Sequence, residues 1–100
     1  MNFTSLEMKG ITRFLVGENI DPQRLRFHIS EIEPGTRSHP PHTHTGIEAF
    51  YIFEGNAGVE MDGETRAVGT NEAILIDPSR PHGLVNIGTT RLRYLVILVQ

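Results

Sequence analysis

The chain has 100 residues, with 9 basic and 12 acidic side chains, five histidines and no cysteine. A chain of this length has room for one domain with one hydrophobic core. The absence of cysteine excludes disulfides, thiolate metal sites and a cysteine nucleophile. The net charge of −3 gives no electrostatic reason to bind nucleic acid or an anionic membrane. No stretch approaches the ~20 apolar residues that span a bilayer, so we expect a cytoplasmic protein with neither kind of partner.

Short apolar runs separated by glycine and proline predict an all-β fold. In chain order, the expected strands lie near 14–16, 25–30, 49–53, 58–61, 65–68, 73–76, 84–87 and 91–99. Many short strands with turns between them are typical of a sandwich or barrel.

Three local patterns refine this expectation. Asp62-Gly63 predicts a tight hairpin turn, because both residues readily adopt positive φ. The run 95–99 is apolar at every position, which predicts burial on both faces. No window has sustained helical periodicity, and the best helical candidate is a single turn around 21–23.

Three histidines lie within six residues, at 39, 42 and 44, and Glu48 follows. In an extended chain, residues two apart point to the same face about 6.6 Å apart, so His42, His44 and Glu48 can project together. Two imidazoles and a carboxylate make half of a divalent-metal site. The alternative to a metal site is that these histidines are exposed residues of a loop next to a strand. His39 does not share the alternation, and we interpret it as a loop or cavity-rim residue.

At these residues the sequence resembles the cupin superfamily. Pro34-Gly35 followed by His42-x-His44-x3-Glu48-x6-Gly55 is similar to the first cupin motif. The resemblance implies an antiparallel double-stranded β-helix, also called a jelly-roll or cupin barrel, over 25–100. Residues 1–24 would then be N-terminal strands and a turn, with the segment 14–16 suited to a dimerisation arm. Small cupins pair as homodimers, so the resemblance also implies a homodimer.

A second match lies near the C-terminus, where Pro78-x2-Pro81-His82-x3-Asn86 is similar to the second cupin motif. Asn71 stands where that motif opens with glycine, and asparagine can also adopt the left-handed conformation. Without the resemblance, His82 would be an ordinary turn histidine. With it, one divalent ion per chain is implied, held by His42, His44, Glu48 and His82.

The neighbouring positions carry alternatives that the sequence leaves open. Phe50 and Ile52 share the parity of Glu48 and are either core residues or the apolar wall of a pocket, whereas Tyr51 faces the other side. Arg26 and His28 face either solvent or the cavity, and in the cavity Arg26 would bind a carboxylate or phosphate. In the last strand, one of Arg93 and Tyr94 points inward. Groups that could assist at the site are therefore Arg26, His28, His39, Tyr51 and Tyr94.

Three imidazoles and a carboxylate leave two positions of an octahedron open, which favours Fe or Mn, while Zn or Ni would also bind. We expect a small metal-dependent enzyme of the isomerase, lyase or dioxygenase type. It would act on a small polar or carbonyl-containing substrate by Lewis-acid or dioxygen activation. The alternative is a non-catalytic cupin that binds a small ligand as a sensor or carrier. A purely structural role does not explain a complete ligand set.

Overall fold

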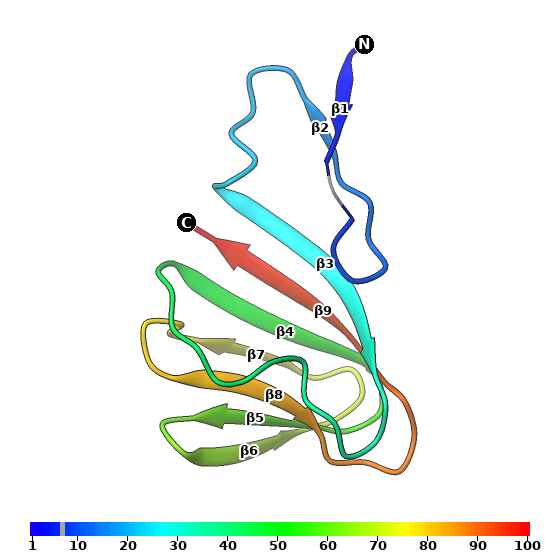
Figure 1. The fold of residues 1–100 in the computed structure, drawn as a ribbon, viewed down its shortest axis with the longest axis vertical. Coiled ribbons are helices and arrows are strands. Elements are labelled where there is room, and N and C mark those ends of the chain that lie inside the picture. The colour runs from blue at the N-terminus through cyan, green and yellow to red at the C-terminus, as the bar shows by residue number, and fades with distance from the viewer. Residues whose placement is uncertain (7) are drawn as a thin grey trace.

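The computed structural model describes residues 1–6 and 8–100, and its described part consists of strands and connecting turns. In chain order the strands are β1 (Phe3–Ser5), β2 (Leu15–Gly17), β3 (Leu25–Ile32), β4 (Ile47–Glu54), β5 (Ala57–Met61), β6 (Glu64–Val68), β7 (Ala73–Ile76), β8 (His82–Asn86) and β9 (Leu92–Val99) (Figure 1). None of the described residues forms a helix able to cross a membrane. The sequence predicted all of these strands except β1, which is too short to show an alternating pattern.

Two antiparallel sheets form the body of the molecule and confirm the expected jelly-roll architecture. One has the order β3-β9-β4-β7 and the other β6-β5-β8 (Figure 1). Between them lies a core whose largest fully buried side chains are Ile52, Leu84 and Leu92, each at most 1% exposed. Ile52 thus belongs to the core.

The register of the larger sheet determines which side chains share a face. Arg26 pairs with Leu98, which in turn pairs with Glu48, so these three lie in one row across the sheet. The neighbouring row on the same face contains His28 of β3, Val96 of β9 and Phe50 of β4. Because directly paired residues point to the same side, the inner face of β3 carries Arg26 and His28.

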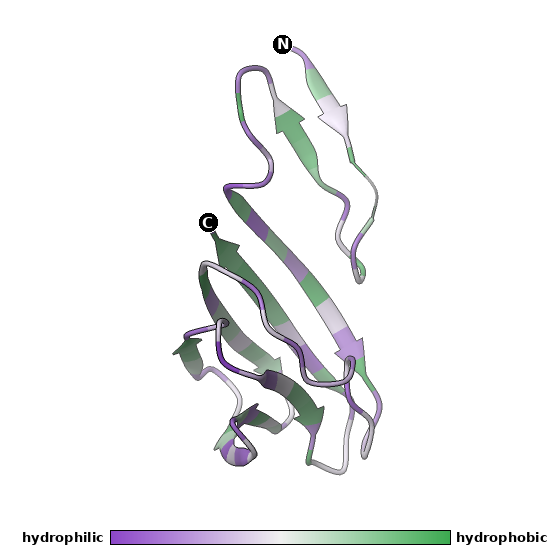
Figure 2. Cartoon of the chain, turned by 60° about the vertical axis from the view of Figure 1, so that its left-hand side comes forward, coloured by the Kyte–Doolittle hydropathy of each residue, from purple (hydrophilic) through white to green (hydrophobic). Residues whose placement is uncertain are grey.

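The outer face of the same sheet is apolar and has no second layer over it within the described residues. Leu25 and Phe27 on β3 are 51% and 44% exposed, and Leu75 on β7 is 71% exposed. Figure 2 shows the corresponding alternation along β3, with hydrophobic and hydrophilic colours in turn. The expectation that 95–99 is buried on both sides is therefore wrong for the single chain: Leu95 to Leu98 are half-buried and Val99 is 40% exposed.

The N-terminal hairpin of β1 and β2 extends beyond the two sheets and lengthens the molecule to 43 Å against 27 and 22 Å (Figure 1). The chain between these strands touches the body at the edge of β3. The amide of Ile11 donates to the carbonyl oxygen of Ile29 at 2.9 Å, and the Ile29 amide donates to the Thr12 hydroxyl at 2.6 Å. This segment therefore covers the free edge of β3.

Backbone conformation at the turns agrees with the sequence. Asp62 and Gly63 have φ of 50° and 83°, which confirms the hairpin between β5 and β6. Asn71 has φ of 64°, the left-handed conformation expected for it. Residues 22–24 form a turn and not a helix.

Candidate metal centre

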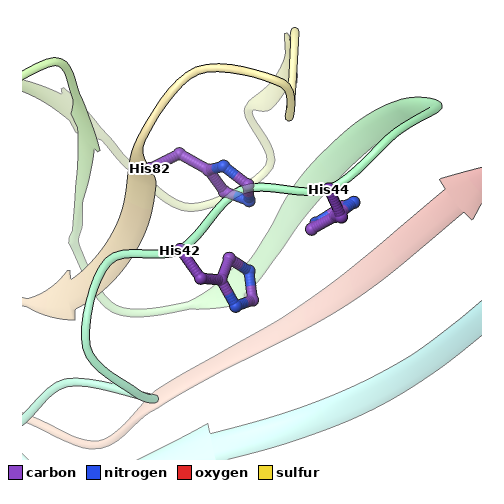
Figure 3. A group of neighbouring side chains, drawn as sticks. All are labelled: His42, His44 and His82. Carbon is purple, nitrogen blue, oxygen red and sulfur yellow. The ribbon is translucent and has the colours of Figure 1, made fainter.

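His42, His44 and His82 converge on one point inside the barrel (Figure 3). One nitrogen from each ring lies within 4.8 Å of the others. His42 and His44 come from the segment before β4, and His82 begins β8. The backbones of His42 and His82 are joined by two hydrogen bonds of 3.0 and 3.1 Å, which attach this segment to the smaller sheet.

Glu48 on β4 supplies a carboxylate to the same point. Its Oε2 is 2.8 Å from Nε2 of His44, and its Oε1 is 3.5 Å from Nε2 of His82. Only 6% of Glu48 is exposed. The structure thus brings together the four residues that the cupin resemblance implied as ligands. His42, His44 and Glu48 do not lie on one continuous extended strand, in contrast to the expectation from alternation. Strand β4 begins only at Ile47, just after Gly46, which has φ of 104°.

His82 has a buried ring nitrogen without a partner in the described part of the chain. Its Nδ1 lies 2.9 Å from the carbonyl oxygen of Arg80, and since a carbonyl only accepts, Nδ1 carries the proton. Nε2 then presents a lone pair, yet no hydrogen bond reaches it, because 3.5 Å to Glu48 is too long for one. An unsatisfied buried polar atom costs about 1–3 kcal/mol, so the site fits an additional electron-pair acceptor.

The ring of His44 is oriented in a similar way. Its Nδ1 lies 3.1 Å from the carbonyl oxygen of Thr45, which leaves Nε2 directed at Glu48. Three imidazole nitrogens and one carboxylate form a donor set that suits a divalent cation of the first transition row. The cluster can therefore bind a metal ion.

His42 shares the site with His39, although His39 is not a member of the three-histidine group. The two rings stack with their centroids 4.0 Å apart. Partial burial, followed by the neighbouring histidines, lowers the pKa of His42 to about 4. His42 is therefore neutral at pH 7, the state in which an imidazole binds metal.

A cavity of about 600 Å³ opens onto this cluster, and His42, His44 and Glu48 line it. Phe50 also lines it, whereas Ile52 does not, so of these two residues Phe50 belongs to the apolar wall. Tyr94 points inward and borders the cavity, and Arg93 takes the outward position. Tyr51 lies on the outer face of the sheet, where its hydroxyl donates to Asn71, and it therefore has no access to the site.

The remaining wall of the cavity comes from β3 and from the segment after β1. Arg26 and His28 lie in this wall, so both face the cavity, and His39 also borders the cavity. Sequence reasoning did not select Lys9 or Ser30, which also line the cavity. Ser30 shares the alternation of Arg26 and His28, so the pattern contained that signal.

Besides His42, two groups in the cavity, His28 and Tyr94, have shifted pKa values. Burial is the largest cause that lowers the pKa of His28 to about 4, and the positive charges of Lys9 and Arg26 add to it. Burial also raises the pKa of Tyr94, so its hydroxyl remains protonated at neutral pH. Both groups are therefore uncharged at pH 7.

A comparison with known families matches residues 28–98 to the Cupin domain. The chain belongs to this cupin family. The match contains both motifs and all four of the clustered residues.

The chain is also similar to individual proteins, in sequence, in fold or in both. The polyketide cyclase RemF of Streptomyces resistomycificus is 33% identical with a TM-score of 0.65, over 76% of this chain and 54% of that protein. A Cupin 2 conserved barrel domain protein of Salinispora arenicola has a TM-score of 0.70 over 98% of this cupin and 74% of its own chain, at 16% identity. An uncharacterized protein of Methanocaldococcus jannaschii is 38% identical over 55 residues, which are 54% of this cupin. The match spans less than half, 44%, of that curated relative.

Proposed function

We propose that this cupin is a metal-dependent enzyme with one divalent ion per chain. The observation that carries the proposal is the buried Nε2 of His82, which lies beside the Glu48 carboxylate and has no hydrogen-bond partner among the residues that the structure describes. Fe or Mn is favoured as the native ion, and Zn or Ni would also bind this donor set. The proposed ligands are His42, His44, Glu48 and His82.

A bound ion would supply Lewis-acid polarisation of a carbonyl oxygen or activation of dioxygen, as in an isomerase, lyase or dioxygenase. The chain's own residues would provide the rest. Tyr94 keeps its proton and can donate a hydrogen bond to a substrate oxygen in the cavity. Phe50 and Val96 provide an apolar surface that excludes water from part of the substrate. These features suit a small substrate that is polar or contains a carbonyl group.

Metal analysis tests the ligand assignment. Purified protein is expected to contain about one divalent ion per chain. Adding back metal at about 100 times its dissociation constant to stripped protein should raise Tm by about 10 °C or more. His44→Ala should lose this rise. His39→Ala is the matched control, because His39 lies on the same segment and outside the three-histidine group, and it should retain the rise.

Two results would contradict the metal assignment. One is wild-type protein that contains no metal and does not gain stability when metal is added. The other is an equal rise in Tm for His44→Ala and wild type.

The alternative function is a non-catalytic carrier or sensor, and the number of polar groups in the cavity beyond the ligands favours the enzyme. The polyketide cyclase among the similar proteins is consistent with an enzyme on this fold. Proton NMR in D₂O would follow exchange of the carbon-bound protons of pyruvate, a simple 2-oxo acid, and an oxygen electrode would follow dioxygen consumption. Metal-dependent exchange or uptake, absent in His44→Ala, is the expected result. Binding without either change would favour the carrier.

A further inference from the structure

The cavity has a cationic side that the metal proposal does not use. Arg26 is half-buried on the inner face of β3, and Lys9 borders the same cavity from the N-terminal segment. His28 lies next to Arg26 on the same face and is neutral at pH 7, so it adds hydrogen-bonding capacity without charge.

Arg26 lacks an acidic partner among residues 1–6 and 8–100. In that part of the chain Arg37, Arg80 and Arg91 each contact a carboxylate, whereas the other arginines contact none, and of these Arg26 is the one that lines the cavity. A guanidinium partly removed from water without a counter-charge is unfavourable. A ligand that brings a negative charge to this position would remove that cost.

Within the described residues, the carboxylate that lines the cavity belongs to Glu48, and it is directed at His44 and His82. It sits in the same cross-strand row as Arg26, with Leu98 of β9 between them. Two strand spacings place the Cα atoms of Arg26 and Glu48 about 10 Å apart. The cationic side and the histidine cluster are thus two separate polar ends of one cavity, with apolar side chains between them.

We propose that this cavity binds a small organic acid whose carboxylate pairs with Arg26 while its other polar end lies at the histidine cluster. The inference rests on the proposed metal-dependent function for the second of these contacts only. A guanidinium binds a carboxylate through two parallel hydrogen bonds, which gives orientation as well as affinity. Leu98 and Phe50 would contact the carbon chain between the two ends.

Calorimetric titration of the full chain with succinate tests the proposal, in metal-loaded and metal-free protein. Arg26→Gln should weaken succinate binding about tenfold or more, since charge-assisted hydrogen bonds are lost. Arg26→Lys should recover part of the affinity. Arg66→Gln removes the same charge from exposed β6 on the other sheet and should bind as wild type does. Succinamide, which has the same length and no charge, should bind none of the variants.

Thermal unfolding without ligand separates this role from a structural one. Within residues 1–6 and 8–100 Arg26 has no carboxylate partner in the free protein, so Arg26→Gln should leave Tm unchanged or raise it. A lower Tm, together with succinate binding equal to that of wild type, would overturn the proposal. Arg26-dependent binding that is tighter for inorganic phosphate than for succinate would overturn the carboxylate assignment.

Metal content measured on the same samples distinguishes the two proposals. If the protein contains about one ion per chain and Arg26→Gln binds succinate as tightly as wild type does, only the organic-acid proposal is contradicted. Absence of metal with Arg26-dependent succinate binding contradicts the metal-dependent function and supports the carboxylate contact.

Discussion

His28 is held neutral in the folded protein, and this couples folding to pH. Its folded pKa of about 4 lies below the ordinary value of 6.5, first because of burial and then because of Lys9 and Arg26. Between pH 6.5 and about 4 the unfolded chain therefore binds a proton that the folded chain does not. The contribution of His28 to stability is fully present above pH 6.5 and is lost as the pH falls from 6.5 towards 4.

We expect His28→Gln to lose less stability than wild type over this pH range. Urea unfolding of metal-free protein at pH 7, 5.5 and 4.5 measures the difference. His42 also has a pKa lowered to about 4 and is present in both proteins, so its effect cancels in the comparison. Parallel stability profiles for the two proteins would contradict the burial of a neutral His28.

Sequence periodicity identified the clustered side chains only in part. Alternation grouped His42, His44 and Glu48, because the spacing is local. His82 is 34 residues after Glu48, and nothing local distinguishes it from a turn histidine; the motif resemblance alone selected it. The sequence left open whether Arg26 faces solvent or the cavity. Alternation shows that a strand has two faces, but not which of them faces a cavity.

The segment between β1 and β2 makes a close contact with β3. Gly10 has φ of 58°, and a Cβ there would lie 2.3 Å from the carbonyl oxygen of Ile29. That oxygen accepts the hydrogen bond from Ile11 that fixes the segment to the sheet. Gly10 is therefore required by both its conformation and its close approach.

Gly10→Ala should destabilise the protein more than Gly35→Ala does. Gly35 has φ of 76° with nothing within 4 Å of a Cβ, so alanine there adds only the left-handed conformational cost of about 1–2 kcal/mol. Gly10→Ala adds the steric overlap to that cost. Urea unfolding of both variants checks this, and equal losses would show that the segment is free to move away from β3.

Strand positions followed from the sequence more closely than strand environments did. The apolar run 95–99 was expected to be buried on both faces, since every position is hydrophobic. In the single chain only the inner side meets the barrel, and the outer side of β9 lies in an exposed sheet face. An apolar pattern predicts that a strand face is buried, but it does not show whether the residues that bury it belong to the same chain.

The larger sheet therefore has an apolar surface on its outer face that runs across β3, β9, β4 and β7. Ile47, Leu75 and Val99 are 57%, 71% and 40% exposed on it, next to Leu25 and Phe27. A groove of about 820 Å³ continues this surface between β3 and the N-terminal hairpin, with Leu15 and Ile20 along it. Monomeric proteins seldom expose a contiguous apolar surface of this kind.

We expect a second copy of the chain to cover this surface, because self-association through one sheet face would also remove the exposed apolar positions of β9. Light scattering coupled to size-exclusion chromatography should give about twice the 11.2 kDa of the single chain. Phe27→Glu places a charge in the middle of the apolar face and should give the monomer mass. Ile87→Glu places the same charge at a 50% exposed position after β8, away from that face, and should leave the dimer intact. A monomer mass for wild type at micromolar concentration would contradict the dimer, and the outer face would then remain exposed to solvent.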